Sequence, residues 1–108
     1  MPHIVPVFAP DTSTPVDRIQ EELGTSWHVA VTVAGWLTVP FALAGTSMIA
    51  IMPERLARRV IRASGLEVLE PPFGSVELVE ATFWHPSRSD DPAVRWLLRT
   101  LHEAAKDL

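Results

Sequence analysis

The sequence predicts an α/β fold with three layers, helices on both faces of a mostly parallel sheet. Two short apolar runs, residues 29–33 and 48–52, are bounded by turn residues, as buried strands are. The residues between them predict a helix, so the two runs form a βαβ unit of adjacent parallel strands with a right-handed crossover. Ligands of open α/β sheets bind beyond the carboxyl ends of such strands. A small-molecule site is therefore expected at residues 35–38 and just after Met52.

Length and composition limit the class of protein. The chain has 108 residues, which suits one domain or part of one. Although 47% of the residues are apolar, no apolar run approaches the roughly 18 residues that span a bilayer. The N-terminus has no basic region before its apolar stretch, unlike a signal peptide. Cysteine is absent, which excludes disulfides and thiolate chemistry. A cytoplasmic location is expected.

The first quarter of the chain predicts a strand and a helix. Residues 3–8 are β-prone, but Pro6 disfavours a central, fully laddered position. After a loop at residues 9–14, Thr14 is placed to cap a helix, with Pro15 in its first turn and Asp17 near the capping-box position. Gly24 ends this helix, and its expected buried stripe consists of Val16, Ile19 and Leu23.

The middle of the chain predicts two more helices. Gly35 allows a sharp turn after the first core strand, and a helix is expected from about residue 36 to residue 44, with Pro40 in or near its first turn. Pro53 begins a basic helix that Gly65 ends. Residues 66–69 predict another short strand.

The basic helix carries the only candidate surface for an anionic partner. Its spacing places the arginines outside and the aliphatic side chains inside, and Glu54 lies four residues before Arg58, a helix-surface pair. A solvated face is the favoured interpretation, and a partner surface is the alternative. With a net charge of −4, the chain is not expected to bind DNA by itself. The outer set is Arg55, Arg58, Arg59 and Arg62, and the inner set is Leu56, Val60 and Ile61.

The last third begins with a stiff connector, Pro71-Pro72-Phe73-Gly74, which is the best candidate for a hinge. Residues 76–84 alternate as a half-exposed strand does. Asp90 or Asp91 caps a final helix with Pro92 in its first turn. Burying four large aliphatic side chains of its stripe would contribute about 6–12 kcal/mol. This helix is therefore expected to dock on a partner subunit or on a part of the same protein that is missing from this sequence; its stripe is Val94, Leu97, Leu98, Leu101 and Ala105.

The sequence offers no catalytic constellation, so the chain is not expected to be an enzyme. Its histidines, His3, His28, His85 and His102, show no metal-ligand spacing, and we expect no metal site and no cofactor. It contains neither a nucleophile elbow nor a phosphate-binding glycine loop.

Ligand binding is the stronger hypothesis. The loop at residues 9–14 follows one strand and precedes a helix, and residues 35–38 repeat that arrangement. Two helix N-termini directed at one cleft would favour an anion such as a carboxylate. The alternative is that Thr14 serves only as a cap and Trp36 only as core.

At these residues the chain resembles the second half of the effector-binding domain of LysR-type bacterial transcriptional regulators, among them those of nodulation and aromatic degradation. The order and spacing of several short motifs carry the resemblance over nearly the whole chain. They are Pro2-His3-Ile4-Val5, Leu43-Ala44-Gly45-Thr46, Ile49-Ala50-Ile51-Met52-Pro53-Glu54-Arg55-Leu56-Ala57, Trp84-His85-Pro86 and Asp91-Pro92-Ala93-Val94-Arg95-Trp96-Leu97.

The resemblance implies a fold like that of type II periplasmic binding proteins, with an effector in the cleft between two subdomains. Residues 1–108 would form a partial effector-binding domain, with about 10–70 in the second subdomain. Residues 75–108 would supply a strand and helix that return to the other subdomain. The effector contacts implied for this half are Pro10, Asp11, Thr12, Gly35, Trp36, Leu37 and Thr38.

The resemblance also implies a function. The chain would be an effector-sensing and oligomerisation fragment of a regulator, binding an organic acid or aromatic effector. A homodimer or domain-swapped oligomer is expected, with DNA contacted only through an N-terminal helix-turn-helix domain that this sequence does not contain. The alternative is a stand-alone α/β module that binds a small molecule or a partner without a role in transcription.

Overall fold

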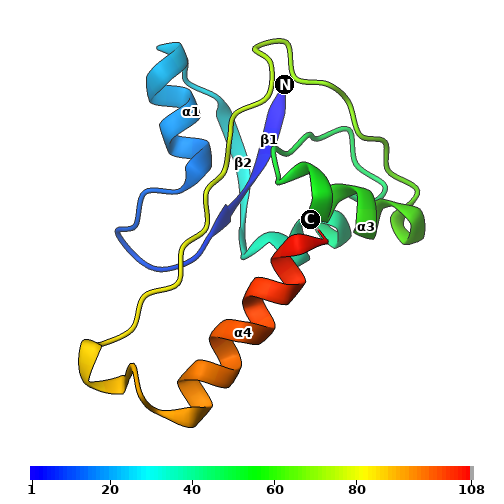
Figure 1. Ribbon diagram of the computed structural model, residues 1–108. Helices are drawn as coiled ribbons and strands as arrows, with labels where there is room; N and C mark the ends of the chain where they lie inside the picture. Colours follow the sequence, from blue (N-terminus) through cyan, green and yellow to red (C-terminus); the bar gives the residue numbers. More distant parts are fainter. Residues whose placement is uncertain (108) are drawn as a thin grey trace. The chain divides into compact units, whose positions relative to one another are not determined.

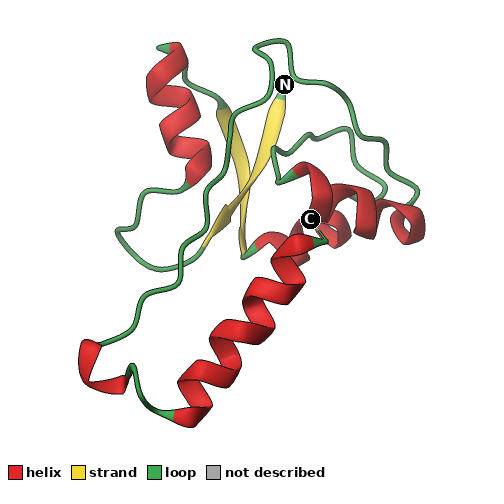
Figure 2. Ribbon diagram, viewed as in Figure 1, coloured by secondary structure: helices red, strands yellow, loops and turns green. Residues whose placement is uncertain are grey.

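The computed structural model describes residues 1–107, which belong to two compact units. The first unit, Met1–Leu78, holds two strands and three helices, and the second begins at Val79 and holds the last helix (Figures 1 and 2). The first unit has its core around a parallel strand pair. It is therefore the unit that can carry the predicted binding edge.

The two strands of the first unit are parallel. β1, Pro2–Val7, pairs with β2, His28–Ala34, along its whole length. On the other side of β1, Ile49 forms a single parallel bridge with His3. The N–H of Ile4 donates to the carbonyl oxygen of Ile49 at 2.9 Å. The parallel direction of the three segments agrees with the prediction, but their order does not.

The βαβ unit predicted from residues 29–33 and 48–52 is wrong in one respect. β1 lies between these two segments, so they are not adjacent in the sheet. The second segment also forms only the bridge at Ile49 rather than a full strand. A helix that connects two parallel strands requires the strands to run in the same direction. It does not require them to be neighbours, so a third strand can lie between them.

Pro6 is compatible with the central place of β1 because of the parity of the strand. Ile4 directs its N–H toward Ile49, whereas Val7 accepts from Gly35 at the end of β2. Pro6 shares the parity of Ile4, so its missing N–H lies on the side where the ladder has already ended. The expectation that Pro6 disfavours a fully laddered position therefore holds for one side of β1 only.

The core of the first unit gathers around β1. Ile4 is 1% exposed and Val39 is fully buried. α2, Val39–Leu43, packs against β1 and against α3, Glu54–Ser64. The four arginines of the basic helix are exposed as predicted, but the buried residue is Ala57, whereas the predicted inner set, Leu56, Val60 and Ile61, is only half-buried. The other buried residues are Val5, Pro6, Thr14, Val16, Ile19 and Pro40.

α1, Pro15–Leu23, begins and ends at the predicted residues. The Thr14 side chain accepts from the N–H of Asp17 at 3.2 Å, and the N–H of Thr14 donates to the Asp17 carboxylate at 2.6 Å. This is the capping box that the spacing predicts. Leu23, however, is 41% exposed, so the predicted buried stripe ends at Ile19.

The helix predicted over residues 36–44 is divided into η1, Trp36–Thr38, and α2. Pro40 explains the division, because it has no N–H to donate to the carbonyl of Trp36 four residues earlier. Val39 donates to that carbonyl instead, which closes a 3₁₀ turn. The α-helix then starts beyond the turn.

Two predicted strands do not form. Residues 66–69 and 76–84 carry no regular secondary structure. A strand needs the backbone of a neighbour to complete its ladder, and the sheet described for residues 1–107 contains β1 and β2 alone. Alternating hydrophobicity shows which side chains would share a face of a strand. It does not provide the neighbouring strand that the backbone needs for hydrogen bonding.

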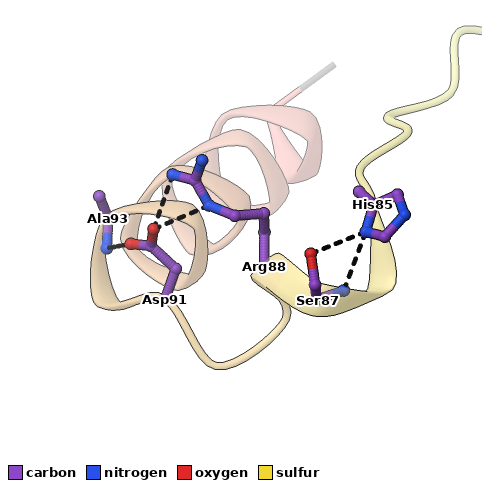
Figure 3. A network of polar contacts seen from close by, with 5 residues as sticks. All are labelled: His85, Ser87, Arg88, Asp91 and Ala93. Carbon is purple, nitrogen blue, oxygen red and sulfur yellow. Dashed lines mark hydrogen bonds and ion pairs between the residues drawn. The ribbon is translucent and has the colours of Figure 1, made fainter.

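In the second unit, α4, Pro92–Lys106, follows the short η2 turn, Pro86–Arg88. Figure 3 shows the polar contacts at the junction between η2 and the start of α4. Asp91 accepts from the N–H of Ala93 at 2.9 Å and from the Arg88 guanidinium at 2.7 Å. Asp91 rather than Asp90 is therefore the cap. His85 holds the η2 turn, because its Nδ1 accepts from the N–H of Ser87 at 3.2 Å.

The apolar stripe of α4 lacks cover within the described residues. Leu97 is 48% exposed and Leu101 is 43% exposed, whereas Val94 and Leu98 are half-buried. The exposed stripe offers apolar surface for docking, and the docking of α4 itself stays a prediction.

Asp91 makes the stability of the first turn of α4 sensitive to acid. The N–H of Ala93 and the guanidinium of Arg88 lower the pKa of the Asp91 carboxyl below its ordinary 3.8. A lowered pKa in the folded state means that the stabilisation is complete above pH 3.8 and is lost as the pH falls through the lowered value. We expect helical circular dichroism to fall in that acidic range.

The matched control is Asp91→Asn, since asparagine also caps helices but does not titrate. The acid loss of helix should be smaller in this variant than in the wild type. Identical acid profiles for the two proteins would show that Asp91 is not responsible.

Candidate functional site

The carboxyl ends of β1 and β2 lie next to each other. Val7 and Ala34 are the last paired residues of the parallel ladder. The N–H of Gly35 donates to the carbonyl oxygen of Val7 at 3.0 Å, which ties the start of the turn to the end of β1. The loop at residues 8–14 and the turn at residues 35–38 therefore leave the sheet at one edge.

An aromatic contact joins these two segments. The rings of Phe8 and Trp36 are 5.5 Å apart between centroids and tilted by 59°, a favourable aromatic geometry. Phe8 is 53% exposed and Trp36 is half-buried. Each ring thus packs against the other and still offers surface to a ligand, so Trp36 is not only core.

The seven predicted binding residues all belong to these two segments. Leu37 is 65% exposed, and Gly35 takes a positive φ of 68° that opens the turn. The hydroxyl of Thr12 donates to the carbonyl oxygen of Ala9 at 2.7 Å. The residues from the first segment are Pro10, Asp11 and Thr12, all exposed, and those from the second are Gly35, Trp36, Leu37 and Thr38.

The sequence predicts that the helix N-termini at this edge favour an anion, but their geometry does not support this. The first turn of α1 is closed by its own capping box, in which Thr14 is only 4% exposed. The Asp17 carboxylate already occupies that position, with its oxygen 2.7 Å from the Thr14 hydroxyl. α2 is too short, at five residues, to carry a strong macrodipole. Thr14 therefore serves as a cap.

Phe8 is a candidate site residue that the sequence prediction missed. It directly follows the last residue of β1 and contacts Trp36 across the edge. The available signal was its position, since the first residue beyond a parallel strand lies at the ligand-binding edge of the sheet.

Two open hollows on the surface do not coincide with this edge. One, of about 580 Å³, runs along α1 and is lined by polar residues that include Asp17 and Glu21. The other, of about 250 Å³, lies beside Trp84 in the second unit. None of the seven predicted residues lines either hollow.

Residues 1–107 show neither a metal site nor a membrane-spanning helix. Residues 1–107 contain no group of three or more His, Cys, Asp or Glu side chains that could hold a metal ion. Within the same residues, no helix is both long and apolar enough to cross a membrane. The His85 ring is engaged by the Ser87 hydroxyl, 2.7 Å from its Nδ1.

Comparison with known proteins decides the family. The family described as the LysR substrate binding domain matches residues 1–106. The chain belongs to this family. The regulatory domain of MexT, a transcriptional activator in Pseudomonas aeruginosa, superposes with a TM-score of 0.67 at 32% identity, covering 93% of this chain and 50% of that domain. The LysR substrate-binding fold, like that of type II periplasmic binding proteins, is thereby confirmed.

Curated relatives agree. Nodulation protein D of Bradyrhizobium sp. (strain ANU 289) is 36% identical over 87 residues, 81% of this chain and 26% of that protein. Nodulation protein D 1 of Sinorhizobium fredii (strain NBRC 101917 / NGR234) is 32% identical over 108 residues, 98% of this chain and 34% of that protein. The chain thus spans about a third or less of these regulators. Its relatives are transcriptional regulators and not enzymes.

Proposed function

We propose that this LysR substrate-binding domain senses a small effector at the shared carboxyl edge of β1 and β2. The contact between Phe8 and Trp36 carries the proposal, because it joins the two loops that leave this edge. Residues 10–70 would form one wall of an interlobe cleft. The strand-like and helical segments of residues 75–108 would return to the other lobe.

The chemistry of the edge favours an aromatic effector. Phe8, Trp36 and Leu37 offer ring and aliphatic surface, whereas Thr12 and Thr38 offer hydroxyl oxygens that can accept a hydrogen bond. Binding sites for small molecules commonly combine an apolar lining with a few polar groups. A phenol, which donates an O–H to such an oxygen, suits this mixture better than an aliphatic acid does.

The exposed stripe of α4 supports the oligomeric part of the proposal. The MexT regulatory domain is about twice as long as the matched region, so a preceding half of such a domain is a candidate to cover Leu97 and Leu101. A second copy that exchanges α4 is the other candidate. DNA would be bound through an N-terminal domain, in the cytoplasm.

A thermal-shift screen tests the function. The longest natural protein that contains this domain is heated with benzoate, phenylacetate, phenol, acetate and succinate. We expect one or more aromatic compounds to raise the melting temperature in proportion to the logarithm of concentration. Stabilisation by none of these compounds, or by the aliphatic acids alone, would contradict the proposal and would favour a partner-binding module.

A further inference from the structure

Three aromatic side chains from distant parts of the sequence stack at the amino end of the β1–β2 pair. The rings of His3 and Trp27 are 5.1 Å apart between centroids and only 10° from parallel. The ring of Phe73 continues the stack, 6.4 Å from Trp27 and inclined by 19°. His3 lies in β1 and Trp27 directly precedes β2. The stack is therefore at the opposite end of the strands from the candidate binding edge.

Phe73 belongs to residues 66–84, which we call the connector because they link α3 to η2. Figure 1 shows the connector, yellow-green at this point, passing the amino end of β1. From residue 67 to residue 84 all side chains are exposed except Pro71 and Phe73, which are half-buried. Among the described residues, the one backbone hydrogen bond of the connector is internal, from Gly74 to Pro71 at 3.1 Å. The aromatic stack is therefore the place where the connector is held on the first unit.

The stack is weak for a tertiary contact. Its three rings are only half-buried, and one aromatic pair shifts an equilibrium about two- to tenfold beyond the effect of the area that it buries. The Nδ1 atom of His3 is buried without a hydrogen-bond partner, and such an atom opposes the packing around it. Holding the connector in one conformation also costs chain entropy. A contact with these properties is expected to open and close.

The position of Phe73 connects the stack to the movement of the lobes. Under the proposed function, residues 75–108 return to the other lobe, so the end of the connector that lies before residue 75 is a hinge. While Phe73 packs on Trp27, only residue 74 is free between the stack and the returning segment. Once Phe73 is released, the free chain begins at the end of α3 and includes residues 66–74. A longer flexible segment permits a wider range of movement.

We propose that the stack of His3, Trp27 and Phe73 is a releasable anchor that sets the length of this hinge. The closed anchor shortens the hinge and restricts the lobes, and the open anchor frees them. The hinge role rests on the proposed function, whereas the opening and closing of the stack does not. The stack is therefore measured first by itself, in the absence of effector.

Fluorine NMR of the chain labelled with 5-fluorotryptophan observes the anchor, and Trp27→Phe identifies the Trp27 signal. We expect relaxation dispersion to show Trp27 exchanging between a major stacked environment and a minor released one. In Phe73→Ala the signal should move to the released position. His3→Phe keeps a ring and removes the unpartnered Nδ1, so the released population should fall at least about fivefold. Phe83→Ala removes a ring that is 89% exposed in the same connector and should match the wild type.

Cleavage by a protease that cuts after glutamate measures the hinge in the longest natural protein that contains this domain. Glu67 lies in the hinge and Glu77 in the returning segment. Phe73→Ala should speed cleavage after Glu67 at least about tenfold, because the free chain becomes longer. Cleavage after Glu21 and Glu22 in α1 should stay at the wild-type rate, which separates release of the anchor from global unfolding.

The two measurements can fail separately. The anchor is overturned if wild-type Trp27 shows no exchange, if Phe73→Ala leaves its signal unchanged, or if cleavage after Glu67 does not respond to this substitution. Equal rates of cleavage after Glu67 and Glu77 in the wild type would instead contradict the return of residues 75–108 to the other lobe, and with it the hinge role.

Discussion

Ile4→Ala is expected to destabilise the domain by about 2–5 kcal/mol, the usual cost of truncating a fully buried isoleucine. Ile4 is 1% exposed at the centre of β1, and its N–H also holds Ile49. A small domain has a total stability of only about 5–15 kcal/mol. The variant should therefore lose a large part of its stability and unfold at clearly lower urea concentrations.

Val7→Ala in the same strand is the matched control. Val7 is 44% exposed, so its truncation removes little buried surface and should change the free energy of unfolding far less. Urea unfolding followed by tryptophan fluorescence compares the two. Equal effects of the two substitutions would show that the core does not centre on β1.

Trp36→Ala is expected to weaken binding of an aromatic effector at least about tenfold, because each 1.4 kcal/mol of lost contact is a factor of ten. Trp36 packs on Phe8 and joins the two loops of the edge, so the substitution removes a ligand contact and loosens the partner ring. Isothermal titration with the best compound from the thermal-shift screen measures the loss.

Trp36→Phe should retain most of the affinity, since it keeps an aromatic ring at this position. Trp96→Ala provides a second comparison, because Trp96 is 60% exposed on α4 and lies outside both loops. If Trp36→Ala bound the effector like the wild type, the ligand would contact another part of the protein.

Local signals in the sequence predicted the helices well. Thr14 with Asp17, Pro53 with Gly65, and Asp91 with Pro92 mark helix ends through chemistry that acts within a few residues. These interactions do not depend on the rest of the chain. For the same reason, the two loops of the candidate site could be located from the strand and helix that flank each of them.

Sheet order and pairing could not be predicted in the same way. Nothing in residues 48–52 indicates that Ile49 pairs with His3 of β1 rather than with a residue of β2. The run at residues 76–84 has the alternation of a strand, but its ladder depends on a neighbour that local sequence does not specify. The aromatic pair of Phe8 and Trp36 is likewise visible only once β1 and β2 lie side by side.

The most direct test of the binding edge is amide NMR of the protein during titration with phenol. Residues 8–12 and 35–38 are expected to show the largest chemical-shift changes, together and with one dissociation constant, because both segments leave the same end of the β1–β2 pair. Changes confined to the hollow along α1, or to only one of the two loops, would contradict a shared effector site at this edge.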